Sequence, residues 1–133
     1  MAGTSIPSTV PDVEAWLIQT LGPAVAPAPV RNMKPDQKPP YSCVVVRADL
    51  QNRVTPVSRY CRVGVQAWKV TANQKADLAG ARELCAAAAT ALELATRAGI
   101  LLDAQIDAGP YRVVDATSGI EYQYASVLLE IAV

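Results

Sequence analysis

The sequence predicts a single domain of the α/β (α+β) class, with a mainly antiparallel or mixed sheet flanked by an N-terminal helix and one long alanine-rich helix. Two long segments alternate apolar and polar residues as strands do, and the stretch between them repeats apolar residues at helical spacing. The 133 residues, 51% of them hydrophobic, are enough for one packed core. We therefore expect one domain over residues 1–133.

The N-terminal part predicts a helix followed by a proline-rich loop. Ser8 or Thr9 can cap this helix with Pro11 in its first turn, and Gly22-Pro23 is expected to end it. Its apolar face is formed by Val13, Trp16, Leu17 and Leu21. Six prolines within 23–40 exclude a helix there and predict a loop with one short extended piece at 30–33.

Strands are expected at 41–49, 58–70 and 121–133, with a polar loop at 50–57 and a hairpin from a short strand at 111–115 through the turn 116–119. One face of each long strand is apolar: Cys61, Val63, Val65 and Ala67 in the first, and Ala125, Val127, Leu129, Ile131 and Val133 in the second. The opposite faces are mixed: Tyr60, Arg62, Gln66 and Trp68, and Tyr122, Tyr124, Ser126 and Glu130. Both strands are therefore half-buried.

A helix is predicted over 73–98. Its apolar stripe consists of Leu78, Ala81, Cys85, Ala88, Leu92 and Ala95. About 26 helical residues span roughly 39 Å, and about 12 strand residues span roughly 40 Å, so the helix can lie along a strand. The many alanines favour close packing on the sheet, although alanine is also simply the best helix former.

The two longest strands have about twice the usual length of about 5 or 6 residues. We expect them to project past the core or to pair with another chain. Arg59 and Arg62 would blunt an open strand edge in a monomer, whereas pairing with a neighbouring subunit would use that edge.

The sequence offers little for catalysis or cofactor binding. It has no His, which excludes Ser-His and Cys-His pairs and His-based metal sites, and its glycines form no phosphate-binding motif. The three cysteines lack CxxC spacing and are expected to be reduced and buried. Asp103 and Asp107 can be interpreted as paired acids, but solvated acids in a connector after the helix are favoured. We expect no catalytic residue, cofactor, metal, signal peptide or membrane span.

The charges are unevenly distributed although the total is zero. Residues 30–69 contain eight basic and two acidic residues, a net charge of +6, and the rest of the chain carries −6. Such a distribution favours head-to-tail contacts between copies, which close into a ring if the rotation permits. Solvated charges without a partner are the alternative interpretation.

The order of the elements resembles that of the tail terminator (tail completion) proteins of long-tailed bacteriophages. The resemblance covers most of the chain: a helix, a proline-rich loop, YSCVVVRADL, SRYCRVGVQAWKV, the alanine-rich helix and GPYRVVDATSGIEYQYASVLLEIAV. In the last segment Gly109-Pro110 precedes the hairpin, and Tyr122 and Tyr124 precede the final apolar strand. The family has no short signature motif, and the proline-rich segment departs from its pattern.

The resemblance implies a non-enzymatic structural protein that assembles as a homo-oligomeric, hexameric ring. Such a ring caps the tail tube, stops polymerisation of the tube protein and joins the tail to the head-side connector (stopper) protein, while genome DNA passes through without specific binding. The protein would be assembled in the host cytoplasm and located in the virion, at the head-proximal end of the tail. The candidate contacts are the loops 31–40 and 50–57 and the residues Arg47, Asp49, Arg53, Arg59, Arg62, Tyr122 and Tyr124.

Other interpretations stay open. Asp49 and Arg53 can form a local salt bridge instead of an intersubunit contact. The chain can also be a neck or head-tail adaptor ring protein, or a small cytosolic enzyme or ligand-binding α/β domain that uses Tyr60, Tyr122 or Asp103. An enclosed pocket with converging polar groups would favour the last of these. A basic nucleic-acid-binding protein is the least favoured, because the net charge is zero.

Overall fold

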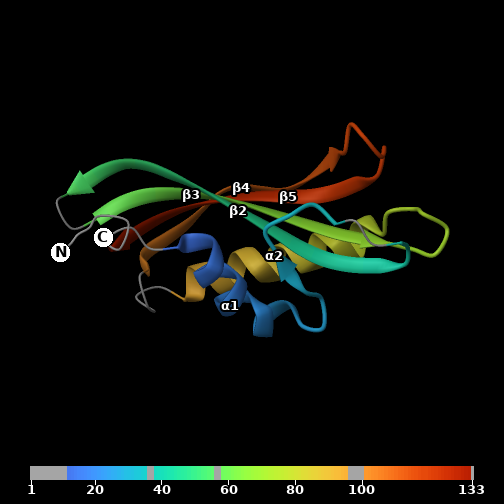
Figure 1. Ribbon diagram of the computed structural model, residues 1–133, viewed down its shortest axis with the longest axis horizontal. Coiled ribbons are helices and arrows are strands. Elements are labelled where there is room, and N and C mark those ends of the chain that lie inside the picture. The colour runs from blue at the N-terminus through green and yellow to red at the C-terminus, as the bar shows by residue number, and fades with distance from the viewer. Residues whose placement is uncertain (1–11, 36–37, 56–57, 96–100, 133) are drawn as a thin grey trace.

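The computed structural model describes residues 12–35, 38–55, 58–95 and 101–132, with only the backbone for 50–55. The described residues form two layers, a five-stranded sheet and a pair of helices that cover one of its faces (Figure 1). The elements are α1 (Val13–Val25), β1 (Val30–Arg31), β2 (Tyr41–Thr55), β3 (Ser58–Val70), α2 (Leu78–Leu94), β4 (Leu101–Val114) and β5 (Glu121–Ala132).

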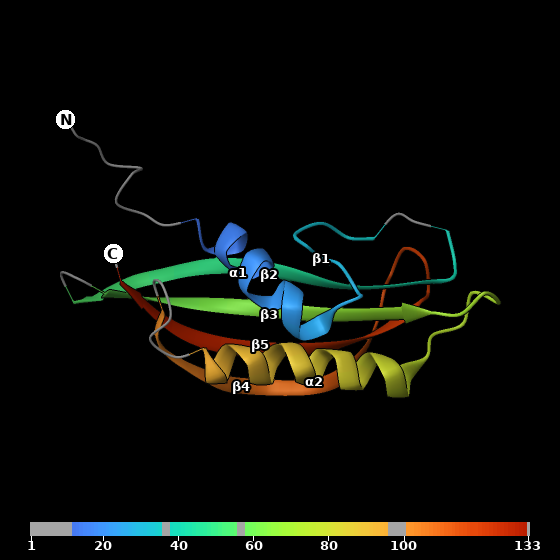
Figure 2. The ribbon, with the colours of Figure 1, turned by 90° about the horizontal axis from the view of Figure 1, so that it is seen from below.

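The strand order is β1-β2-β3-β5-β4. The short β1 runs parallel to β2, and all other neighbouring strands are antiparallel. Figure 2 shows α1 on the β2 side of the sheet and α2 on the β4 side. The predicted class, a mixed and mainly antiparallel sheet flanked by an N-terminal helix and an alanine-rich helix, is confirmed.

The main core lies between the sheet and the two helices. The apolar faces predicted for β3 and β5 are buried there, apart from Val133, which lies outside the described residues, and so is most of the predicted stripe of α2. The fully buried members include Val63, Val65, Cys85, Ala88, Leu92, Val127 and Leu129. Small side chains at Ala81, Ala88 and Ala89 bring α2 close to the sheet, because little bulk separates the two backbones.

Two strands are longer than predicted. The expected polar loop at 50–57 is wrong over its first part, because β2 continues to Thr55 and pairs with β3 through two register shifts. β4 begins at Leu101, so Asp103 and Asp107 lie in a strand and not in a connector. Three register shifts in β4 break the alternation of its side chains, which is why the sequence pattern did not indicate a strand.

Both helices differ from their predicted bounds. The residues after β3 form a turn, in which Gln74 has φ of 63° and its backbone N–H donates to the Thr71 carbonyl oxygen. α2 therefore begins only at Leu78, capped by the Asp77 carboxylate, which accepts from Gly80 N. Residues 96–98 of the predicted helix lie outside the described part of the chain.

α1 is capped by Asp12, whose carboxylate accepts from Ala15 N at 3.0 Å. The expected caps Ser8 and Thr9 lie outside the described residues. The expected stop at Gly22-Pro23 is wrong, since the helix continues through Pro23 to Val25. Pro23 has no backbone N–H and cannot donate a helical hydrogen bond. Burial of the Val25 side chain, which is 3% exposed, offsets this loss in the last turn of the helix.

The sheet is longer than the helices that cover it. α2 has 17 residues, about 25 Å, whereas the 13 residues of β3 span about 43 Å. One end of the sheet, where β2 ends and β3 begins, therefore projects past the helices, as expected (Figure 1). The strand that carries Arg59 and Arg62 is an interior strand between β2 and β5, so the prediction that these arginines blunt an edge is wrong.

Candidate interface on the open face of the sheet

We call the sheet face opposite the helices the open face. It carries the residues that alternate with the buried ones. On β2 these are Cys43, Val45, Arg47 and Asp49; on β3 they are Tyr60, Arg62, Gly64, Gln66 and Trp68; on β5 they are Tyr122, Tyr124, Ser126, Leu128 and Glu130. The register with β5 adds Asp103, Gln105, Tyr111 and Val113 of β4. Among the described residues, neither helix packs on this face.

One end of the open face is aromatic. Trp68 stacks on Tyr122 with ring centroids 4.4 Å apart and an interplanar angle of 21°. Tyr41, Cys43, Val45 and Ile120 complete this small second cluster, and Trp68 is only 2% exposed. The sequence placed Trp68 on the correct face, but its burial depends on a strand partner that alternation alone does not identify.

A second aromatic pair follows along the same face. The Tyr124 ring meets the Tyr111 ring edge-on at 5.5 Å. Tyr124 also crosses over Gly64 of β3, where an added methyl group would lie 2.7 Å from the Tyr124 Oη. Burial raises the pKa of Tyr124, and the nearby Tyr111 contributes in the same direction. Both rings therefore belong to the open face, where Tyr111 stays 47% exposed.

The centre of the open face is charged. Arg62 Nη1 donates to the Asp107 carboxylate and lies 3.4 Å from Ser126 Oγ. Arg62 and Asp49 are opposite each other in neighbouring strands, and the exposed Arg47 is two residues away on β2. Among the predicted contact residues, the structure thus brings together Arg47, Asp49 and Arg62, with Asp107 as a member that the sequence did not assign.

Two of the predicted contact residues, Arg53 and Arg59, are not part of this charged centre. Arg59 is opposite Ile131, a buried core residue, so Arg59 lies on the helix side of the sheet. Its Nε is buried, with no hydrogen-bond acceptor among the described residues. Arg53 is opposite Arg59 in the backbone ladder, but the side chain of Arg53 lies outside the described part. Arg59 therefore does not share the open face with Arg47 and Arg62.

A hollow of about 440 Å³ lies beside the charged centre, at the β2 edge. It is lined by Glu14, Arg47, Ala48, Asp49, Arg62, Gly64, Gln66 and Tyr124. Glu14 comes from α1, and its carboxylate accepts from the backbone N–H of Ala48 at 2.8 Å and from Asn32 Nδ2 at 3.2 Å. Since Arg47, Asp49 and Arg62 are all exposed, this hollow is open to solvent.

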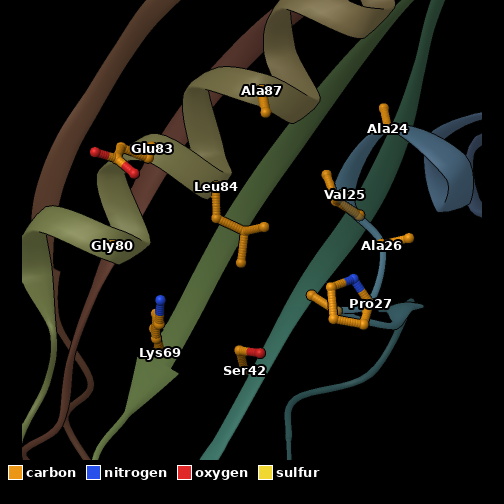
Figure 3. A pocket seen from close by; sticks show the side chains of 11 residues that line it. Ala24, Val25, Ala26, Pro27, Ser42, Lys69, Gly80, Glu83, Leu84 and Ala87 are labelled. Carbon is orange, nitrogen blue, oxygen red and sulfur yellow. The ribbon is translucent and has the colours of Figure 1, made fainter.

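A second hollow, of about 350 Å³, lies on the helix side, where the end of α1 approaches α2 above β2 and β3 (Figure 3). It is lined by Ala24, Val25, Ala26, Pro27, Ala28, Ser42, Lys69, Gly80, Glu83, Leu84 and Ala87. Lys69 points toward the first turn of α2, where its Nζ lies 3.7 Å from the Asp77 carboxylate. Tyr60, Tyr122 and Asp103, the residues expected to serve a ligand-binding domain, line neither hollow.

The predicted contact loop at 31–40 is exposed over most of its described residues, but it is anchored. Lys34 Nζ lies 2.7 Å from the Asp115 carboxylate, which also accepts from the backbone N–H and the hydroxyl of Ser118. The lysine and Ser118 lower the pKa of Asp115 to about 2. The loop is thereby tied to the turn between β4 and β5.

The three thiols are buried and free, as predicted. Burial raises the pKa of Cys43 and of Cys61 to about 11, and that of Cys85 to about 12. Across the described ranges, no cluster of three or more Cys, Asp or Glu side chains could hold a metal ion. Neither α1 nor α2 is long and apolar enough to cross a membrane, and the described part contains no other helix.

A comparison of the sequence with protein-family models finds no matching family, and a comparison with curated proteins finds no match either.

Proposed function

We propose that this chain is a phage tail structural protein that acts as a ring on the end of the tail tube. The ring stops polymerisation of the tube protein and provides the joint to the head-side connector protein, without catalysis. The observation that carries the proposal is the open face, a broad surface of four long strands that combines two aromatic pairs with exposed charges of both signs. Such a surface suits contact with another protein.

The charged centre supports a stoichiometric role more than a reaction. Arg62 and Asp107 are 44% and 46% exposed, so their ion pair contributes at most about 1 kcal/mol to folding. Exposed charges of this kind mainly direct association and select partners. Arg47, Asp49 and Arg62 are therefore the residues that we assign to contacts with the tube protein or with a neighbouring copy.

The hexameric ring, the location in the virion and the passage of DNA without specific contacts belong to the same proposal. They rest on the resemblance in element order. The hollow at the β2 edge is wide open, which favours this role over a ligand-binding domain, because small-molecule sites usually enclose most of their ligand.

The test is a capping assay. Purified protein is mixed with its cognate tail tubes, and tube ends are examined by negative-stain electron microscopy. We expect extra density at one end only, together with arrest of tube growth. Bare ends at saturating protein would refute capping, and binding to portal-connector complexes instead would identify a neck adaptor.

A matched pair of charge-reversal variants tests whether the open face makes the contact that caps the tube. Arg62→Glu changes the open face, whereas Arg82→Glu makes the same change on an exposed position of α2. We expect R62E to lose capping at concentrations where the wild type and R82E still cap. Equal capping by both variants would remove the charged centre from the contact surface. Thermal unfolding of each variant checks that the fold is retained.

A further inference from the structure

The sheet has two outer edges, and each is held by a glutamate from the neighbouring helix. On one side, β1 covers β2 only at Val44 and Val45, and the Glu14 carboxylate then accepts from Ala48 N at 2.8 Å. On the other side, the Glu93 carboxylate lies 3.4 Å from the backbone nitrogen of Ile106 in β4. Figure 2 shows why this is possible, since α1 runs beside β2 and α2 beside β4.

These contacts occupy backbone N–H groups that another strand would use for pairing. An outward backbone N–H at a sheet edge needs an acceptor and is a template for pairing with another chain. A glutamate side chain satisfies the donor, yet it is long and flexible enough to move aside. Among the described residues, no strand pairs with the outer edge of β4, or with the outer edge of β2 beyond Val45, although β3 pairs with the inner edge of β2.

The strand directions make the two edges complementary. β2 is antiparallel to β3, β3 to β5, and β5 to β4, so β2 and β4 run in opposite directions. If β4 of one copy lies beside β2 of the next, the pair is antiparallel and the sheet continues across the contact. Both copies then keep their helices on the same side, as a ring or an open array of equivalent subunits requires.

The side chains define a register. Ala48 and Ile106 both direct their N–H groups outward, and both pack against the helix-side core. Placing Ala48 opposite Ile106 keeps apolar residues on the helix side and puts Arg47 opposite Asp107 on the open face. These two positions are exposed and opposite in charge. The register shift between Ile106 and Ala108 limits the regular ladder to the β4 residues before it.

We propose that copies of this chain associate head to tail by pairing the β4 edge of one copy with the β2 edge of the next, and that Glu14 and Glu93 hold these edges closed in the free monomer. The inference names the subunit contact of the proposed ring, and to that extent it rests on the proposed function. Because the ladder is short, the contact is weak until the glutamates are displaced or a tube holds neighbouring copies together.

Variants that each add one cysteine test the register without tubes. With Ala48 opposite Ile106, the exposed Asp49 and Gln105 are opposite each other within the regular ladder. D49C and Q105C are prepared separately in a Glu14→Ala/Glu93→Ala background, then oxidised alone and as a mixture. Opposite residues of this kind in an antiparallel pair have Cα atoms about 4.5 Å apart, which suits a disulfide. We expect disulfide-linked dimers in the mixture, and none in either protein alone or in a mixture of D49C with D103C. The native thiols are buried with raised pKa values and do not compete.

Sedimentation measures the role of the glutamates. We expect E14A and E93A each to strengthen self-association about tenfold, because each edge loses one hydrogen bond to a charged acceptor in the monomer. The control is E83A, which removes an exposed glutamate of α2 that lines the hollow beside the end of α1. Equal self-association of E83A and the edge variants would overturn the role of the glutamates.

The crosslinking outcomes separate this inference from the proposed function. No dimers in the D49C and Q105C mixture, or as many in one variant alone, would overturn the edge pairing. Crosslinks without capping of tubes would refute only the tail function. Capping without crosslinks would refute only the edge pairing.

Discussion

Replacement of Gly109 by alanine tests whether β4 is bent against β5 as described. Gly109 has φ of 88°, in the left-handed region that costs an L-residue about 1–2 kcal/mol. An added Cβ would lie 2.3 Å from the carbonyl oxygen of Tyr124 and 2.8 Å from the Cα of Ala125. Both atoms belong to the backbone of β5, so no side-chain rotation relieves the contact.

The magnitude follows from these two effects. Forcing a methyl group into a packed site costs about 1–3 kcal/mol, and together with the backbone conformation the loss of stability is about 2–5 kcal/mol. Gly119 supplies the control, because it also has a positive φ, of 74°, but no described atom lies within 4 Å of an added Cβ. G119A should therefore lose only about 1–2 kcal/mol.

Urea denaturation, followed by tryptophan fluorescence, measures the difference. With a slope of about 2 kcal/mol per molar urea, the midpoint of G109A should lie about 0.5–1.5 M below that of G119A. Equal midpoints would show that β4 does not approach β5 at Gly109, and the register on both sides of this glycine would then be wrong.

Three further outcomes are expected. The pKa of Asp115 is lowered to about 2, so its contribution to stability is complete above about pH 4 and disappears as the pH falls toward 2; thermal unfolding across this range should show a smaller acid loss in D115N than in the wild type. The three buried thiols, with pKa values raised to about 11 or 12, should not react with a disulfide reagent at pH 8 until the protein unfolds; fast reaction of the native protein would contradict their burial. Tyr122→Ala removes the ring stacked on Trp68 and should cost about 2 kcal/mol, with a red shift of the native fluorescence that Tyr60→Ala, at an exposed position, does not cause.

The sequence predicted those elements in which one periodicity persists. β3 has the bounds expected from its alternation, and the turn between β4 and β5 lies where glycine and small polar residues indicate it. Most of the buried stripe of α2 was also predicted, because four of its buried residues follow helical spacing: Ala81, Cys85, Ala88 and Leu92. In each case the local pattern and the burial agree.

Elements whose form depends on a distant partner were missed. β4 is a strand because β5 pairs with it, while its own alternation is broken at Gly109 and at two earlier positions. The continuation of β2 to Thr55 likewise depends on backbone pairing with β3, which polar side chains do not prevent.

The candidate surface was predicted only in part. Strand alternation correctly placed Arg62, Tyr122 and Tyr124 on one face. It could not show that Asp107 pairs with Arg62, because that contact requires the order of strands in the sheet. The edge glutamates carry no local signal at all, since Glu14 and Ala48 are separated by 34 positions in the chain.

Most of the buried apolar side chains lie between the sheet and the helices, whereas the open face contributes only a small cluster around Trp68. Folding therefore depends largely on residues other than those of the surface that we propose for recognition. Outside that cluster, the open face can change its partner at little cost in stability. Proteins with this architecture can consequently diverge in what they bind while their fold persists, so that two of them share the order of their elements and hardly any surface residue.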